Sequence, residues 1–225
     1  MKRSSHRRQL QLFETGPGYL DLDLSLHTFS LAIAPIVEQA ILFFNGTPVK
    51  PLPPPSFVGT GVYALYYMGP FGLYARLAAA NRQECSLPIY VGKAVAKGRR
   101  TGRSADSEGP ELSGRLRQHA WNIEYADNLR VDDFRCRFMI LEGAATDLIV
   151  PVESELIRRY KALWNSGIDG FGNHDPGSGR YNQSPSKWDT LHPGREWAKR
   201  LTGEAPRLAD IEAEVQQLLE RLPIP

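Results

Sequence analysis

Two short apolar runs, separated by a helical stretch, constrain the fold most strongly. The first run is residues 61–66, Gly-Val-Tyr-Ala-Leu-Tyr, and the second is residues 88–92, Pro-Ile-Tyr-Val-Gly. Both runs are β-branched and aromatic and are bounded by Gly or Pro, which predicts β-strands. Because alternate side chains of a strand point to opposite faces, the valines are expected to face a core. Antiparallel pairing would then bring Tyr63 and Tyr90 together on one patch of surface, although ordinary cross-strand tyrosines are the simpler interpretation of these strands alone.

The stretch after the second run is basic and leads into a predicted helix. Arg115 and His119 are four residues apart in this helix, residues 112–125, so they share one of its faces. A charge run is most often a solvated surface, but its position before this helix predicts contact with phosphates. The cations of the run, which no acid interrupts, are Lys93, Lys97, Arg99, Arg100 and Arg103.

Taken in this order, the residues resemble the GIY-YIG nuclease superfamily. Residues 61–63, Gly-Val-Tyr, resemble its first motif, and residues 90–92, Tyr-Val-Gly, resemble its second, with valine in place of isoleucine in both. The gap between the motifs is longer than usual, and a polar insert precedes Arg115. The resemblance spans about residues 58–166, and it implies one catalytic set: Tyr63, Tyr90, Arg115, His119, Glu153 and Asn165.

The resemblance implies an α+β fold, in which helices flank a small three-stranded antiparallel sheet. The third strand is predicted at residues 134–141, and further helices at residues 71–81, 148–160 and 208–222. Residues 48–55 hold five prolines and are predicted to be a stiff linker. We expect one compact domain in three parts: an N-terminal arm with a helix that has Pro35 at a break (1–55), a catalytic core with an inserted helix and loops (56–166), and an irregular DNA-reading segment with a C-terminal helix (167–225).

The side-chain types in this set suit phosphodiester hydrolysis. Arg115 offers a fork of donors to phosphoryl oxygens. A free phenol has a pKa near ~10, so a tyrosine base needs a nearby cation; Tyr63, Tyr90 and His119 all remain open as the base. Glu153 is the sole carboxylate of the set, which predicts one hard cation, Mg²⁺ or Mn²⁺, otherwise held by water and phosphate, and products with 5′-phosphate and 3′-hydroxyl ends. Asn165 is expected to fix the geometry.

Sequence recognition is predicted to reside in the loop after Tyr90 and in residues 167–194. A loop of this length is usually functional or disordered, and this one is rich in the residue types that hydrogen-bond base edges. The cations of residues 93–103 are expected to contact phosphates without regard to sequence. Base contacts are predicted for Arg180, Asn182, Gln183, Lys187, Asp189 and the neighbouring Arg195.

Within the superfamily, additions built into the core resemble the small stand-alone type II restriction endonucleases, some of which read palindromic GC-rich hexamers as homodimers. The expected partners are therefore double-stranded DNA, a second copy of the chain and a cognate DNA methyltransferase. A homing or repair nuclease and a non-catalytic DNA-binding protein remain alternatives. His174 and Asp175 with His192 imitate an HNH-type metal site, but the supporting ligands are missing.

Composition excludes several other classes. A net charge of +2 means that a surface for nucleic acid has to come from local clustering of cations. The two cysteines, Cys85 and Cys136, are too far apart for a cysteine zinc site, and they suggest a reducing compartment. No apolar run approaches the ~20 residues of a membrane helix, so we expect a cytoplasmic protein.

Overall fold

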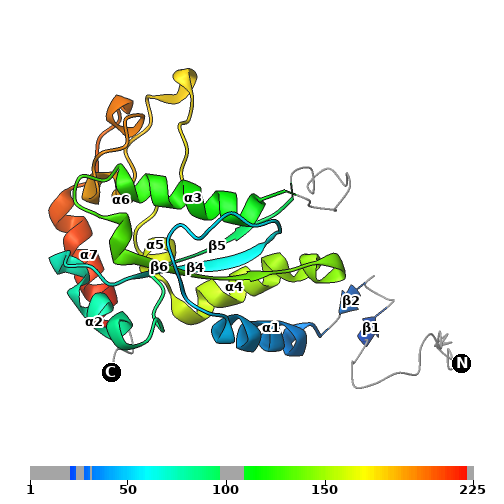
Figure 1. The fold of residues 1–225 in the computed structure, drawn as a ribbon. Coiled ribbons are helices and arrows are strands. Elements are labelled where there is room, and N and C mark those ends of the chain that lie inside the picture. Colours follow the sequence, from blue (N-terminus) through cyan, green and yellow to red (C-terminus); the bar gives the residue numbers. More distant parts are fainter. Residues whose placement is uncertain (1–20, 24–27, 31, 97–108, 222–225) are drawn as a thin grey trace, which may run out of the picture.

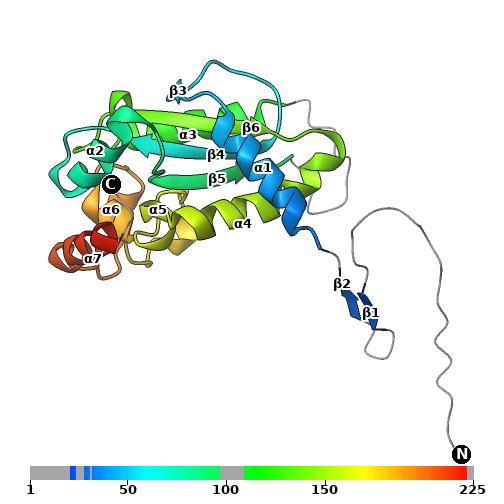
Figure 2. The same ribbon diagram turned by 90° about the horizontal axis from the view of Figure 1, so that it is seen from below.

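A four-stranded antiparallel sheet forms the centre of the fold (Figure 1). The computed structural model describes residues 21–23, 28–30, 32–96 and 109–221. The strands lie in the order β3, β6, β4, β5, and helices pack on both sides of them (Figure 2). The predicted α+β class is therefore confirmed. The strand bounds are Lys50–Pro51 for β3, Gly61–Tyr67 for β4, Tyr90–Ala94 for β5 and Phe134–Ile140 for β6.

The register of β4 and β5 puts the two motif tyrosines on the same face of the sheet. Tyr63 pairs with Gly92, and Leu65 pairs with Tyr90. The valines of the two strands lie in the hydrophobic cluster on the opposite face, as predicted. Tyr63, however, is only 1% exposed. The tyrosines therefore do not meet on a patch of surface: a helix covers Tyr63, because this face of the sheet also faces a core.

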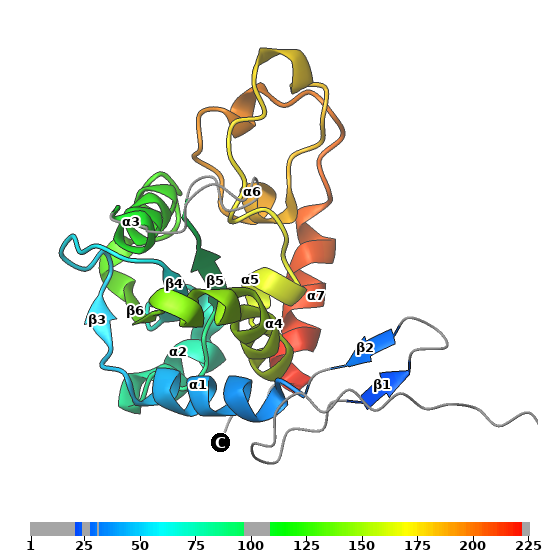
Figure 3. The ribbon, with the colours of Figure 1, turned by 90° about the vertical axis from the view of Figure 1, so that its right-hand side faces the viewer.

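Two helices cover the valine face, α1 (Ala34–Gly46) and α4 (Ile149–Tyr160) (Figure 3). The tyrosine face packs against α3 (Glu111–Glu124), α2 (Ala75–Gln83) and α7 (Leu208–Arg221). Buried apolar residues recur every three or four positions in these helices, which turns one stripe of each toward the sheet. In α3 this stripe is Leu112, Leu116, Ala120 and Ile123, and in α4 it is Ile149, Val152 and Leu156.

The N-terminal part differs from the sequence prediction in two ways. The sheet has four strands and not three, because β3 lies inside the proline-rich stretch that was predicted to be a linker. Proline lacks an N–H donor but is tolerated in an edge strand, and β3 is an edge. Pro35 lies in the first turn of α1 and starts this helix where a break was predicted. A hairpin of β1 (Asp21–Asp23) and β2 (Thr28–Ser30) precedes it.

Residues 167–204, the irregular segment, contain only the short helix α6 (Lys187–Leu191) and brief 3-10 turns. The segment follows α5 (Leu163–Ser166) and leads into α7 (Figure 3). No helix of the described part is both long and apolar enough to cross a bilayer. The 3-10 turns of the described chain are Gly72–Tyr74, Val131–Asp133, Gly143–Leu148, Ser178–Arg180 and Ala198–Arg200.

A chain of buried and partly buried hydrogen bonds ties the irregular segment to the core. The Asn128 amide donates to the Leu191 carbonyl at 2.9 Å, so its oxygen accepts from His192 Nδ1 at 2.8 Å. His192 Nε2 therefore accepts from the Tyr74 hydroxyl at 2.7 Å, and that hydroxyl accepts from Trp164 Nε1 at 3.0 Å. Every polar atom in this chain has a partner, which fixes the end of α6 against the rest of the fold.

Candidate active site

Tyr63 of β4 and His119 of α3 form a buried hydrogen-bonded pair. The Tyr63 hydroxyl lies 2.6 Å from His119 Nε2, and His119 is fully buried. The pair depends on Gly92 in the neighbouring strand. A Cβ atom at Gly92 would lie 2.4 Å from the Tyr63 oxygen, so only a hydrogen atom fits there.

Burial keeps both members of this pair uncharged. It raises the pKa of Tyr63 well above 10.0, and the nearby Arg115 cation only partly opposes this shift. Burial also lowers the pKa of His119 well below 6.5, and Arg115 adds to that shift. His119 Nδ1 has no hydrogen-bond partner in the described chain, and the ring stacks on Phe171 with centroids 4.6 Å apart. The free protein thus holds a neutral phenol against a neutral imidazole.

Tyr90 extends this aromatic cluster toward the surface. Its ring lies 6.2 Å from that of Tyr63 and 5.2 Å from that of His119, and its side chain is partly exposed. Phe171 packs edge-on against it at 4.9 Å. Because a Cβ atom at Gly172 would lie 3.2 Å from the Tyr90 hydroxyl, the backbone of the irregular segment passes close to this phenol.

Glu153 of α4 forms an ion pair with Lys93 of β5. Lys93 was predicted to contact phosphate, and the structure places its ammonium group on the predicted metal ligand. Burial is the main cause that raises the pKa of Tyr63 and of Tyr90, and the charge of Glu153 adds to the shift of both. The described residues contain no group of three or more side chains that could hold a metal by themselves. Glu153, which already faces a cation, fits a hard ion as one oxygen ligand among waters and phosphate.

Asn165 of α5 holds the outer edge of β5. Its amide oxygen accepts from the Val91 N–H at 2.7 Å, and its amide nitrogen donates to the Val91 carbonyl at 2.9 Å. The side chain thereby takes the place of a further strand beside the edge strand. This contact fixes the backbone between Tyr90 and Gly92; the catalytic positioning role of Asn165 stays a prediction.

Arg115 contacts two residues that sequence reasoning did not assign to the site. Its Nη1 atom donates to Gln118 Oε1 at 2.9 Å and lies 2.9 Å from His174 Nε2. Gln118 Nε2 in turn lies 3.0 Å from His174 Nδ1. Arg115 and His174 are 59 positions apart, so no local pattern could have predicted the contact. The pairing of His174 with His192 in an HNH-type site is wrong, because His192 is buried between Tyr74 and Asn128.

The residues predicted to read DNA fall into three groups. Arg180, Asn182 and Gln183 are exposed on the irregular segment. Lys187 pairs with Glu214 of α7 at 2.6 Å. The last group, Asp189 and Arg195, is a buried ion pair. The four phosphate-contact predictions that fall outside the described residues are Lys97, Arg99, Arg100 and Arg103.

The burial of Arg195 and Asp189 corrects their predicted role. Arg195 Nη2 lies 2.6 Å from Asp189 Oδ1, and the side chains are 1% and 3% exposed. The guanidinium also donates to the carbonyls of Gly170, Phe171 and Asn173 at 3.0–3.3 Å, between the rings of Trp188 and Trp197. A cation with its donors committed in this way cannot contact a base edge. Arg195 holds the irregular segment together.

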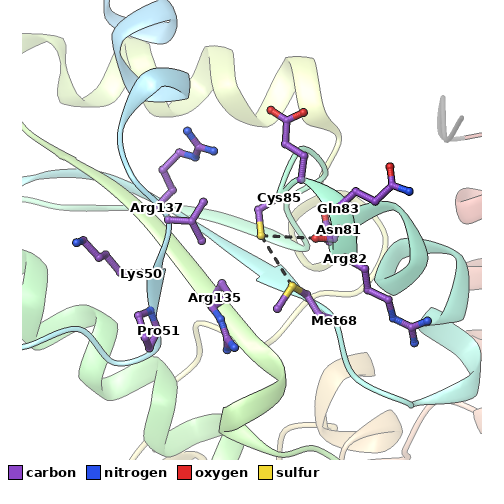
Figure 4. Close-up of a pocket in the computed structure, with 11 residues that line it drawn as sticks. Lys50, Pro51, Met68, Asn81, Arg82, Gln83, Cys85, Arg135 and Arg137 are labelled. Carbon is purple, nitrogen blue, oxygen red and sulfur yellow. Dashed lines mark hydrogen bonds between the residues drawn. The ribbon is translucent and has the colours of Figure 1, made fainter.

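A basic pocket of about 390 Å³ (Figure 4) lies away from the aromatic cluster around Tyr63. Met68, which follows β4, lines it. Met68 is five positions after Tyr63 along the strand, a distance of about 16 Å. Arg137 of this pocket donates to the carbonyls of Asn45 and Thr47 at the end of α1. A cation stabilises a helix C-terminus, so Arg137 has a structural explanation. The other cations around the pocket are Lys50, Arg82 and Arg135.

Comparison with known proteins is informative at the level of the family. A search of curated protein sequences finds no match to the chain. The family model described as the Eco29kI GIY-YIG domain matches residues 55–219, from the strand of the first tyrosine motif through the irregular segment into α7. This match covers most of the chain and contains all the residues assembled around Tyr63. The protein is therefore a member of the Eco29kI GIY-YIG family of restriction endonucleases, and so a nuclease.

Proposed function

We propose that the protein is a type II restriction endonuclease that hydrolyses both strands of DNA at a specific site with one divalent metal. The observation that carries the proposal is the buried Tyr63–His119 pair, with Arg115 and Glu153 close enough to shift the pKa of Tyr63. These four side chains supply proton transfer, donors for phosphoryl oxygens and a ligand for a cation. The products we expect are 5′-phosphate and 3′-hydroxyl ends.

The protein's own groups divide the reaction between them. The attacking water gives its proton to Tyr63, and the phenol passes its own proton to His119 Nε2, 2.6 Å away. Burial disfavours the imidazolium in the free protein. The negative charge of a bound phosphodiester favours it, which makes the transfer dependent on substrate. Arg115 donates to the non-bridging oxygens as charge builds on them, and Asn165 keeps Tyr90 and Gly92 in place.

Glu153 is the residue that would hold the metal, Mg²⁺ or Mn²⁺. A bound divalent ion supplies charge stabilisation to the phosphoryl group and the departing 3′ oxygen. Lys93 is ion-paired with the Glu153 carboxylate in this structure, so this ion pair would have to break before a metal ion could bind to Glu153. Lys93, beside Glu153, would supply a second cation to the site.

We propose that the irregular segment reads the bases. Its exposed side chains, Arg180, Asn182 and Gln183, are of the types that pair with guanine and adenine edges. Replacing Arg180 with alanine should cost roughly 1–3 kcal/mol of binding on the recognised site alone. Lys97, Arg99, Arg100 and Arg103 remain predicted phosphate contacts.

The expected assembly is a homodimer on a palindromic site, which is GC-rich in some enzymes of this kind. A palindromic site has twofold symmetry, and a protein dimer with the same symmetry matches it. The exposed apolar residues of α1, Ile36, Leu42 and Phe43 at 51%, 64% and 66%, support a protein contact on that helix. A methyltransferase that modifies the same site would protect the host DNA.

The test is cleavage of plasmid and phage DNA with Mg²⁺ or with EDTA. We expect discrete bands with Mg²⁺ and intact DNA with EDTA. Glu153→Gln should bind DNA and leave it uncut. Glu155→Gln, two residues along α4 and paired with surface arginines, is the matched control and should cut normally. A smear of fragments, or cutting in EDTA, contradicts the proposal. Binding without any cutting by the unaltered protein would indicate a non-catalytic DNA-binding protein.

A further inference from the structure

His174 connects the irregular segment to the catalytic helix. Its Nε2 atom lies 2.9 Å from Arg115 Nη1, and its Nδ1 atom lies 3.0 Å from Gln118 Nε2. Within the described chain, Arg115 forms no ion pair with a carboxylate. His174 and Gln118 therefore define where the guanidinium of Arg115 lies.

The three contacts cannot all be hydrogen bonds at once. Arg115 Nη1 only donates, so Gln118 Oε1 and His174 Nε2 must both accept. The Gln118 NH₂ group then points to His174 Nδ1, which would have to accept as well. A neutral imidazole has one donor and one acceptor nitrogen, so one contact faces donor to donor. Turning the amide over moves the mismatch to Arg115.

A phosphate oxygen resolves this mismatch. When it accepts from Arg115, the Gln118 amide is released and can turn its oxygen to the N–H on His174 Nδ1. His174 Nε2 continues to accept from Arg115, the freed Gln118 NH₂ group faces solvent, and no two donors then face each other. Among the three side chains themselves one acceptor is missing, and a phosphate oxygen is of the type that supplies it.

The surroundings of His174 fix its position from both sides. Asn173 is held through its carbonyl by the buried Arg195. Asp175 accepts from the Gly177 N–H at 2.9 Å, from the Tyr181 hydroxyl at 2.8 Å and from Arg200 at 2.6 Å. His174 also lines a polar pocket of about 360 Å³ together with Arg180 and Gln183, two of the proposed base readers. His174 thus lies between the proposed base readers and Arg115.

We propose that His174 is a positioning residue that couples base recognition in the irregular segment to the catalytic Arg115. This inference rests on the proposed nuclease function. His174 aligns the guanidinium through Nε2, and the fit of the loop to the correct DNA sequence sets that alignment. His174 itself takes no part in the chemical step.

The experiment compares His174→Ala, His174→Gln and Ser178→Ala with the unaltered protein. Glutamine retains an acceptor for Arg115, while alanine does not. Ser178 is exposed on the same segment and serves as the control for a change in the loop. The substrates are a duplex with the site mapped from fragment ends and a duplex with one base pair of that site changed. Each variant is measured for kcat, KM and DNA binding in EDTA.

We expect His174→Ala to lower kcat by about 10²-fold, the effect of a small misplacement of a catalytic group, while KM and binding stay close to those of the unaltered protein. His174→Gln should recover most of kcat, and Ser178→Ala should change nothing. The base-pair change should slow the unaltered protein far more than His174→Ala.

Three results would overturn the inference: normal kcat in His174→Ala, no recovery in His174→Gln, or a loss confined to binding. If the unaltered protein cuts no DNA at all, the proposed function fails, and this outcome is distinct from those three.

Discussion

Replacing Gly92 with alanine should disable the site through a single contact. Gly92 pairs with Tyr63 across the two central strands, and its backbone is not in the left-handed region. Alanine is therefore acceptable to the backbone, and the whole effect comes from the new methyl group. That group would lie 2.4 Å from the Tyr63 oxygen and 2.6 Å from the ring carbon that carries it.

The size of the effect follows from what Tyr63 can do in response. Ordinary contacts between carbon atoms are about 3.5–4.0 Å, so the phenol has to retreat by about 1 Å. It is 1% exposed and hydrogen-bonded to His119, and it has no free space to enter. Overpacking of this kind costs about 1–3 kcal/mol. A shift of about 1 Å in a proton-transfer group lowers turnover by about 10²-fold.

The assay pairs thermal unfolding with cleavage of the mapped duplex. At this chain length each kcal/mol lowers Tm by about 2–4 °C, so Gly92→Ala should melt a few degrees early and cut far more slowly. Gly114→Ala is the matched control, since a Cβ atom there meets nothing within 4 Å and lies in the helix of Arg115. Unchanged Tm and cleavage in Gly92→Ala would refute the claim that this glycine exists to admit the phenol.

Three further predictions test the protonation and packing of the core. Tyr63→Phe leaves His119 without a partner at either nitrogen. The variant should lose about 1–3 kcal/mol of stability and ~10²–10⁴-fold in cleavage rate, but it should still bind DNA. Normal cleavage would mean that the general base is His119 or Tyr90. Asp189→Asn leaves Arg195 buried without a counter-charge and should cost about 3–5 kcal/mol in urea unfolding, against about 0–1 kcal/mol for Glu214→Gln at the exposed pair with Lys187. Burial lowers the pKa of His192 to about 3, so as the pH falls this residue binds a proton in the unfolded chain before it does in the folded protein. The free energy of unfolding should therefore drop by about 2 kcal/mol from this residue between pH 7 and 5. The same pH dependence in His192→Gln would contradict this assignment.

Much of the core could be predicted because it depends on short-range patterns. Alternation in two strands, with valines on one side and tyrosines on the other, was sufficient to predict which residues share a face, and the register agrees. The spacing of four residues predicted that Arg115 and His119 share one face of a helix, and both residues lie in α3. The family resemblance supplied Glu153 and Asn165, whose positions depend on a fold that no local period encodes.

The irregular segment was harder to predict, because its residues are specified by partners distant in sequence. The composition of the segment favoured Arg195 and Asp189 as base-contacting residues, because a sequence does not show whether a charged side chain is exposed or buried. The structure distinguishes them by the carbonyls of residues 170–173 and the tryptophan rings that surround Arg195. His174 was similarly ambiguous, because its contacts with Arg115 and Gln118 exist only once the segment folds back over α3.

This segment is also part of the support of the active site. Phe171 stacks on His119, packs edge-on against Tyr90 and contacts both Trp164 and Trp188. Arg195 binds the Phe171 carbonyl, so Phe171 alone connects the buried ion pair to the imidazole of His119. Exposed positions such as Asn182 can therefore change, and DNA preference with them, while Phe171 cannot change without moving His119. Variation in site preference among related chains should accordingly concentrate at the proposed base readers Arg180, Asn182 and Gln183, which lie between the fixed positions Asp175 and Ser186.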